Sequence, residues 1–285
     1  MSDRVTIYEV SPRDGLQNEA RPIPTARKIA LVDLLTGCGF SHIEVASFVS
    51  PKWVPQMADG AAVLAGIARA PGVVYAALAP NLKGYAAARA AGAGEVAIFA
   101  SASESFSQRN INCSIAESLA RFAPVAEAAV REGVPLRGYV SCVTDCPFEG
   151  AIAPQSVARV TEQLFTLGCR EVSLGDTIGH GTPDSVERML RVVLETSAAD
   201  RLAGHFHDTR GRALDNIAVA LAHGLRVFDA ACGGLGGCPF APGAAGNVAT
   251  ERVVARLADL GFETGIDPGR LAEAAALARA LRTEG

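Results

Sequence analysis

Short runs of apolar and β-branched residues alternate along this chain with longer stretches in which apolar residues recur at helical spacing. Such an alternation is typical of repeated β–α units, whose strands form a parallel sheet. Eight runs predict strands, at Val5–Val10, His42–Ala46, Val73–Leu78, Glu95–Phe99, Leu136–Ser141, Glu171–Leu174, Leu202–His207 and Arg226–Ala231.

The stretches between these runs carry recognisable helix signals. Ser114 and Glu117 have the spacing of a capping box, and the helix that they open is expected to end at Gly133. Thr182 before Pro183, and Asp267 before Pro268, each place an N-cap residue ahead of a first-turn proline. The predicted terminal helix, residues 268–282, has one apolar face made of Leu271, Ala274, Leu277 or Ala278, and Leu281.

Eight strands, each followed by a helix, predict an α/β protein with a (β/α)8 TIM barrel and an additional C-terminal helix. No linker, charge run or low-complexity segment divides the chain, so residues 1–285 are expected to form one catalytic domain. A doubly wound open sheet is the competing architecture. Its dinucleotide fingerprint is absent after the first strand, where Val10 is followed by Ser-Pro-Arg-Asp-Gly, and we therefore predict the barrel.

Composition narrows the classes of function. The 285 residues are 49% hydrophobic and 20% charged with a net charge of −4, which argues against a nucleic-acid partner. No apolar run reaches the ~18 residues of a membrane span, and the N-terminal residues lack the features of a signal peptide, so we expect a cytoplasmic protein. The seven cysteines are odd in number and lack Cys-x-x-Cys spacing, which favours free buried thiols.

Polar residues gather where the predicted strands end, which is the edge at which barrel active sites lie. His205 and His207 alternate on the seventh strand and so point to the same side. With Asp14 after the first strand and Asn247 after the eighth, they offer one carboxylate, two imidazoles and an amide oxygen. This set without thiolate suits Mg²⁺ or Mn²⁺ as the cofactor, and such a cation acts as a Lewis acid on a bound oxygen.

Each of these four residues also has a simpler interpretation. Taken alone, Asn247 is better explained as the N-cap of the last barrel helix than as a metal ligand. Asp14, which is next to Arg13, can be a turn residue or a member of a surface ion pair. Either histidine can be a satisfied core residue. The convergence of all four at one rim of one barrel nevertheless favours a metal site.

Further groups are candidates for the chemistry. Arg13 lies beside an expected ligand and has the planar charge that stabilises an enolate or a carboxylate. Glu44 and Asp176, expected at the mouth or interior of the barrel, are either paired with Arg13 or tuned for proton transfer. Cys238 stands in a segment of six glycines and two prolines between residues 231 and 247. That segment is either a flexible loop with an incidental thiol or a closing loop with an acid/base thiol.

Along nearly its whole length the sequence resembles the hydroxymethylglutaryl-CoA lyase family, within the larger group of metal-dependent barrel enzymes that make or break bonds next to a carbonyl. The arginine–aspartate pair and the His-x-His are shared with isopropylmalate and homocitrate synthases, whereas the loop around Cys238 distinguishes the lyases. The matching stretches are SPRDGLQNE from Ser11, SFVSPKWVPQM from Ser47, PNLKG from Pro80, NINCSI from Asn110, RGYVSC from Arg137, SLGDTIG from Ser173, HFHDT from His205 and GLGGCPFAPGAAGN from Gly234.

The resemblance implies a role for each site residue. The divalent cation is held by four residues, Asp14, His205, His207 and Asn247. The catalytic residues are Arg13, which stabilises the enolate on the thioester, the acid/base group Cys238, and Glu44 and Asp176. The substrate-binding residues are Arg13, Gln17, Tyr139 and Ser173.

The implied reaction cleaves (3S)-3-hydroxy-3-methylglutaryl-CoA to acetyl-CoA and acetoacetate, as in leucine breakdown and ketone-body formation. The base that takes the C3 hydroxyl proton is Asp176 or His205. Phe206, Arg210 and His180 stand where animal members have cysteine, tyrosine and valine, so the acyl-branch preference is open.

Three alternatives accompany this expectation. They are a lyase for a longer-branched 3-hydroxyglutaryl-CoA homologue, a condensing synthase that joins acetyl-CoA to a 2-oxo acid, and a catalytically silent metal- or CoA-binding protein. In each enzymatic case an acyl-CoA is the partner. We expect a homo-oligomer, with a dimer as the first expectation.

Overall fold

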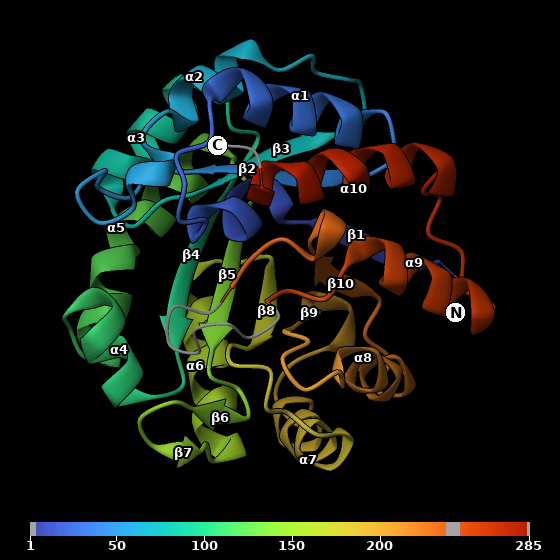
Figure 1. Ribbon diagram of the computed structural model, residues 1–285. Coiled ribbons are helices and arrows are strands. Elements are labelled where there is room, and N and C mark those ends of the chain that lie inside the picture. The colour runs from blue at the N-terminus through green and yellow to red at the C-terminus, as the bar shows by residue number, and fades with distance from the viewer. Residues whose placement is uncertain (1–3, 238–245, 284–285) are drawn as a thin grey trace.

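The structure is a computed structural model that describes residues 4–237 and 246–283. Eight parallel strands close into a barrel in the order β1-β10-β9-β8-β5-β4-β3-β2, and helices surround it (Figure 1). The barrel strands are β1 (Thr6–Glu9), β2 (His42–Ser47), β3 (Val74–Leu78), β4 (Glu95–Ser101), β5 (Leu136–Ser141), β8 (Glu171–Asp176), β9 (Leu202–Phe206) and β10 (Val227–Ala230). The predicted TIM barrel is therefore confirmed, and no strand end differs from its prediction by more than two residues.

Helices α1 to α9 follow the strands, and α10 is the additional C-terminal helix. Their bounds are α1 (Thr25–Thr36), α2 (Gly60–Gly66), α3 (Leu82–Ala90), α4 (Glu104–Ile111), α5 (Ile115–Glu132), α6 (Pro154–Leu167), α7 (Pro183–Val193), α8 (Ala213–Ala222), α9 (Thr250–Asp259) and α10 (Pro268–Thr283). In Figure 1 α10, drawn in red, lies alongside α1, and the two helices are in contact.

The helix signals in the sequence are confirmed in the structure. The Ser114 hydroxyl accepts a hydrogen bond from the backbone N–H of Glu117, whose carboxylate accepts one from the N–H of Ser114 in return. Gly133 ends α5 in the left-handed conformation. Thr182 caps α7, and the Asp267 carboxylate accepts backbone N–H bonds in the first turn of α10.

The short elements in the segments that connect the barrel strands and the main helices were not predicted. They include a π-helical turn η1 (Ser11–Gly15), the helix α4, and a small antiparallel hairpin of β6 (Asp145–Cys146) and β7 (Gly150–Ala151). Three 3₁₀ turns complete the list, namely η2 (Pro55–Met57), η3 (Ala199–Arg201) and η4 (Cys232–Gly234). Elements of two to eight residues span too few periods of a hydrophobic pattern to stand out in the sequence.

One local prediction is wrong. Asn247 does not cap the last barrel helix, because α9 begins at Thr250 and its N-cap residue is Ala249, which makes no side-chain cap. Asn247 instead forms a bridge with His207, and the Val248 N–H donates to the Phe206 carbonyl. The segment before α9 is thus paired with the end of β9, and this long-range contact overrides the local capping preference of asparagine.

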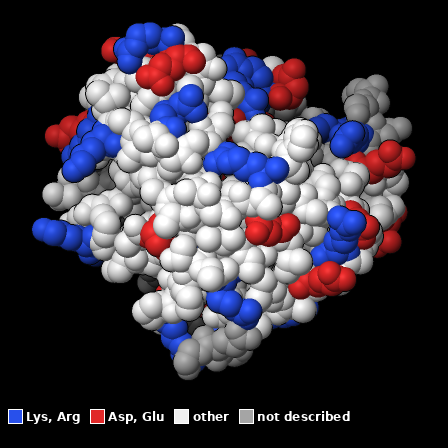
Figure 2. Space-filling view, turned by 90° about the horizontal axis from the view of Figure 1, so that it is seen from above, with Lys and Arg blue, Asp and Glu red and all other residues white. Residues whose placement is uncertain are grey.

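The main hydrophobic core lies between the barrel strands and the surrounding helices, and it includes the predicted apolar face of α10. The six cysteines that the structure describes are free and buried, as expected, whereas Cys238 lies outside the described residues. In the described part of the chain, no helix is long and apolar enough to cross a membrane. On the face shown in Figure 2, charged side chains of both signs are scattered among uncharged ones without forming a large area of one sign.

Candidate active site and metal centre

The turn that follows β1 places Arg13 and Asp14 at the barrel mouth. After Val10 the chain enters the π-helical turn η1, in which the N–H groups of Asp14 and Gly15 both donate to the Val10 carbonyl. π-Helical turns are rare and are often found at functional sites. Gly15 allows a close approach here, because a Cβ at this position would lie 2.8 Å from the Cβ of Leu235.

The end of β9 brings the two histidines to the same place. His205 is on β9 and His207 follows directly, with their ring centroids 5.3 Å apart. One ligand atom from each of Asp14, His205 and His207 can be chosen so that all three lie within 4.8 Å of one another. The predicted convergence of strands 1 and 7 at one site is thus present.

The residues present fit a divalent cation. The Nδ1 atom of His207 is buried and has no hydrogen-bond partner among the described residues, which is costly for an imidazole unless another group binds there. Burial lowers the pKa of His207 to about 4, with a further contribution from neighbouring His205, so the ring is held neutral as a metal ligand must be. The carboxylate of Asp14 adds an oxygen donor, and the mixed oxygen and nitrogen set suits Mg²⁺ or Mn²⁺.

Asn247 belongs to the same cluster, although its amide faces Asp14 as a donor. Its Nδ2 donates to Asp14 Oδ2 at 2.8 Å and to the Leu235 carbonyl at 3.3 Å. A ligand role requires the amide oxygen, and rotating the amide by about half a turn would exchange its oxygen and nitrogen. The structure therefore places Asn247 at the site, and its binding of the cation stays a prediction.

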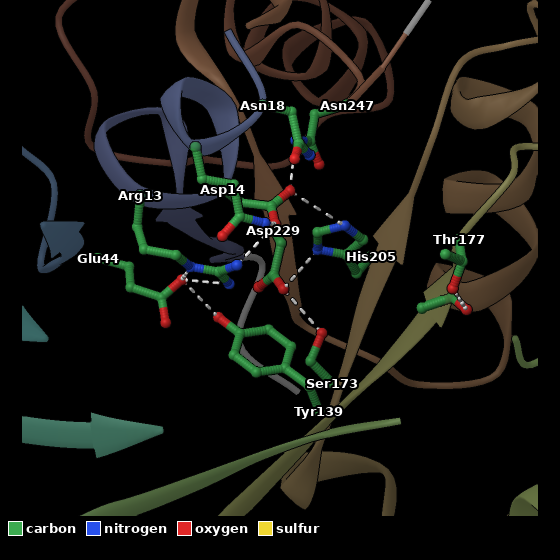
Figure 3. Close-up of polar contacts among 12 residues, drawn as sticks. Arg13, Asp14, Asn18, Glu44, Tyr139, Ser173, Thr177, His205, Asp229 and Asn247 are labelled. Atoms are coloured by element: carbon green, nitrogen blue, oxygen red, sulfur yellow. Dashed lines mark hydrogen bonds and ion pairs between the residues drawn. The ribbon is translucent and has the colours of Figure 1, made fainter. Parts of the chain in front are cut away.

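Two carboxylates hold Arg13, which is only 5% exposed. Glu44 Oε2 lies 2.6 Å from both Nε and Nη2 of Arg13, and Asp14 Oδ1 lies 2.6 Å from Nη1 (Figure 3). The Arg13–Asp14 ion pair thus exists, but it is largely buried and not on the surface. Burial raises the pKa of Asp14, whereas Arg13 and His205 lower it more strongly, to about 2.

Glu44 is paired with Arg13, which was one of the two roles expected from the sequence; the other was proton transfer. Its Oε2 also accepts a hydrogen bond of 3.1 Å from the Tyr139 hydroxyl, and its Oε1 is buried with no hydrogen-bond partner in the described part of the chain. The Tyr139 ring lies under the Arg13 guanidinium, at 5.3 Å from its centroid. Glu44 therefore orients Arg13. It lies on β2, next to a register irregularity at residues 44–46.

Gln17 and Asp176, which were also expected at the active site, have different surroundings. Gln17 Nε2 donates to Asp14 Oδ1 at 3.3 Å, which places Gln17 beside the metal cluster. Asp176 ends β8, and its carboxylate accepts hydrogen bonds from the Thr144 hydroxyl and from the backbone N–H groups of His180 and Gly181. These contacts fix the loop that follows β8 instead of pairing with Arg13.

Asp229 and Arg137 are parts of the site that the sequence did not indicate. Asp229 on β10 accepts hydrogen bonds from Arg137 (2.7 and 3.2 Å), from the Ser173 hydroxyl (2.7 Å) and from His205 Nδ1 (3.0 Å). Burial raises the pKa of Asp229, but Arg137 and His205 hold it well below its ordinary range. The available signal was an aspartate among apolar residues in the strand Arg226–Ala231.

The stem of the glycine-rich segment packs against these residues. Gly236 has φ of +116°, and a Cβ there would lie 2.7 Å from Asn247 Nδ2, so only glycine fits. Arg282 of α10 donates to the carbonyls of Gly234 and Gly236. The extra helix therefore anchors the segment that leads to Cys238, whose own position lies outside the described residues.

A model of the HMGL-like family matches residues 4–278. The chain belongs to the HMGL-like family. The 3-hydroxy-3-isohexenylglutaryl-CoA/hydroxy-methylglutaryl-CoA lyase of Pseudomonas aeruginosa is 57% identical to it over 271 residues, which are 95% of this chain and 90% of that protein.

Solved structures of other HMGL-like proteins have the same fold. The HMG-CoA lyase from Brucella melitensis is 62% identical, with a TM-score of 0.98 over 99% of both chains. An HMG-CoA lyase from Acinetobacter baumannii in complex with coenzyme A and 3-methylmalate is 41% identical, with a TM-score of 0.94 over 99% of this chain and 92% of that one.

Proposed function

We propose that this HMGL-like protein is a lyase that cleaves 3-hydroxy-3-methylglutaryl-CoA to acetyl-CoA and acetoacetate with a divalent cation. The observation that carries the proposal is the meeting of Asp14, His205 and His207 beside the buried Arg13 at the barrel mouth. Relatives of 53–58% identity that are named as hydroxymethylglutaryl-CoA lyases support the reaction. They also favour a lyase over a condensing synthase or a silent binding protein.

Arg13 is suited to stabilise the charge that develops as the C2–C3 bond breaks. A divalent cation at Asp14 and the histidines supplies Lewis-acid polarisation of an alcohol or carbonyl oxygen. A guanidinium has five N–H donors, so the contacts of Arg13 to Glu44 and Asp14 leave donors for the thioester oxygen. Because Glu44 and Tyr139 fix its position before substrate arrives, Arg13 meets the enolate oxygen without reorganisation.

Two proton transfers complete the reaction. A base takes the C3 hydroxyl proton as the ketone forms, and we propose Cys238 as the acid that protonates the acetyl-CoA enolate. Asp176 and His205 are the two candidates for the base, and His205 qualifies only if its unprotonated ring nitrogen does not bind the cation. If Asp176 is the base, Asp176→Asn lowers kcat and leaves Mn²⁺ affinity unchanged, whereas His205→Gln is expected to weaken Mn²⁺ binding whichever group is the base.

The deciding experiment measures acetoacetate release from 3-hydroxy-3-methylglutaryl-CoA with Mg²⁺ or Mn²⁺. We expect Cys238→Ser to lower kcat by about 10²-fold or more, the usual effect of losing a general acid or base. Cys113→Ser, which changes another thiol in the same way, is the matched control and is expected to keep near-normal activity. The proposal fails if the wild type releases no acetoacetate, or if Cys238→Ser turns over normally.

A longer-branched substrate is the second candidate. The Pseudomonas aeruginosa relative is named for both a 3-hydroxy-3-isohexenylglutaryl-CoA and a hydroxymethylglutaryl-CoA substrate. The ratio of kcat/KM for these two acyl-CoAs decides between them. A ratio above ten in favour of the isohexenyl compound would reverse the assignment of the main substrate.

The identity of the metal ion, the oligomeric state, the location in the cell and the metabolic role are also part of the proposal. We propose Mg²⁺ or Mn²⁺ as the ion because the donor set contains no thiolate. A homodimer, a cytoplasmic location and a role in leucine breakdown are consistent with this reaction. Metal analysis of the purified protein, analytical ultracentrifugation and cell fractionation test the ion, the dimer and the location in turn.

A further inference from the structure

Asp229 lies beneath the metal cluster at the centre of a dense set of hydrogen bonds. Its carboxylate is 2% exposed and receives hydrogen bonds from three side chains on three other strands. Arg137 is on β5, Ser173 on β8 and His205 on β9, and together with β10 these strands are consecutive in the barrel. Figure 3 shows Asp229 with His205 on one side and Ser173 below.

The contact with His205 determines which ring nitrogen carries the proton. An ionised carboxylate can only accept hydrogen bonds, so the 3.0 Å contact to Asp229 Oδ2 requires a proton on His205 Nδ1. In the neutral ring Nε2 is then the atom with a free lone pair. Nε2 is also the atom that faces the metal cluster, at 3.9 Å from Asp14 Oδ2.

Asp229 is itself held so that it cannot turn away from His205. Two nitrogens of Arg137 contact its two oxygens, and the Ser173 hydroxyl binds the same Oδ2 that accepts from His205. Arg137 is fixed in turn by Glu171 at 2.7 Å and by the Tyr8 ring, whose centroid is 3.9 Å from the guanidinium carbon. All of these groups sit on strands, where side chains are positioned rigidly.

We propose that Asp229 is a positioning residue of the metal site, which holds His205 as the Nδ1-protonated tautomer and so presents Nε2 to the divalent cation. Arg137 and Ser173 keep the carboxylate in place. The inference rests on the proposed metal-dependent function. Carboxylates in this position raise the basicity of a histidine ligand and fix its orientation, and their loss weakens metal binding by about 10- to 100-fold.

The first test is direct measurement of Mn²⁺ binding by titration calorimetry, with kcat and KM measured alongside. Asp229→Asn is expected to raise the Kd for Mn²⁺ by about tenfold or more, because an amide next to Arg137 and Ser173 must turn its NH₂ group toward a donor. Glu9→Gln is the matched control, since Glu9 is also a fully buried carboxylate on a barrel strand, and it accepts hydrogen bonds from the N–H groups of Ser11 and Cys232 and from the Thr250 hydroxyl. An unchanged Kd in a folded Asp229→Asn variant overturns the proposal, as does an equal loss in Glu9→Gln.

A second measurement needs no variant of Asp229. Nitrogen-15 spectra of histidine-labelled wild type at alkaline pH report the tautomer of each of the five histidines, and His205→Gln assigns the signals. The expected result is a proton on Nδ1 of His205 in the metal-free chain, and a proton on Nε2 overturns the proposal. Because this spectrum requires neither metal nor turnover, it decides the inference even if the wild type fails to cleave the acyl-CoA, which would refute the proposed function alone.

Discussion

Glu9 is a buried carboxyl group whose ionisation is expected to cost this protein stability at neutral pH. It is fully buried on β1, and its side-chain hydrogen bonds go to residues other than the expected metal ligands. Its Oε1 accepts from the N–H groups of Ser11 and Cys232, and its Oε2 accepts from the Thr250 hydroxyl. Burial raises its pKa from 4.5 to about 7, although these hydrogen bonds partly oppose the shift. Replacing Glu9 by glutamine removes the ionisation and keeps every hydrogen bond, because the amide NH₂ can donate to the Thr250 oxygen.

The direction and size of the effect follow from the two pKa values. Below pH 4.5 the carboxyl is protonated in both folded and unfolded chains. Between pH 4.5 and about 7 the unfolded carboxyl ionises while the folded one keeps its proton, so wild-type stability falls as pH rises. Above about pH 7 both are ionised and the loss is complete. At ~1.4 kcal/mol for each pH unit over which only the unfolded carboxyl is ionised, the rise of the pKa from 4.5 to about 7 gives a loss of about 3–4 kcal/mol.

The assay is denaturant unfolding of wild type and Glu9→Gln at several pH values between 5 and 8, with circular dichroism as the signal that monitors unfolding. The variant is expected to gain stability relative to wild type by a growing amount across this range, reaching about 3–4 kcal/mol over the whole titration. Glu127→Gln, on the exposed surface of α5, is the control and should show a nearly constant difference. If the difference between Glu9→Gln and wild type is the same at pH 5 and pH 8, the reasoning from burial is wrong.

Three further outcomes are expected. Ser114→Ala removes the N-cap of α5 and should lower the unfolding free energy by about 1 kcal/mol, so an unchanged denaturation midpoint would contradict the role of the capping box. Gly236→Ala forces a side chain against Asn247 at positive φ and should cost about 1–3 kcal/mol and weaken Mn²⁺ binding, whereas Gly211→Ala, also at positive φ but in open space, should affect stability alone. Mn²⁺ at about a hundred times its Kd should stabilise the wild type by about 2.7 kcal/mol, and the same thermal shift in Asp14→Ala would place the ion elsewhere.

The fold could be read from the sequence because every barrel strand is a buried run with a clear start and end. Leu136–Ser141 was predicted with the bounds that it has, and Asp267 and Pro268 marked the start of α10. The hairpin β6–β7 and helix α4 were missed because they are short and their stability depends on tertiary contacts. The Ser105 N–H, for example, donates to Glu149 of the hairpin loop, 44 positions along the chain.

The residues of the candidate site could be predicted from the sequence, but most of their hydrogen-bond and ion-pair partners could not. Asp14 and the two histidines follow strand ends, and barrel topology alone brings such positions together. The role of Asp229 could not be inferred in the same way, because it depends on the contact with Arg137, which is 92 positions away in the sequence. The capping interpretation of Asn247 failed for the same reason, since a neighbour in space replaced a neighbour in sequence.

The charged interior of the barrel restricts how this scaffold can be remodelled. Arg137, Glu171 and Asp229 lie on separate strands, yet each neutralises or orients another. Removing one partner of a buried pair costs about 3–5 kcal/mol, whereas replacing both by apolar groups of similar volume is often neutral or stabilising. Directed evolution by single substitutions would therefore meet a fitness valley at these positions. A library that changes Arg137 and Asp229 in the same step could cross that valley and supply barrels with a new interior on which to build other sites.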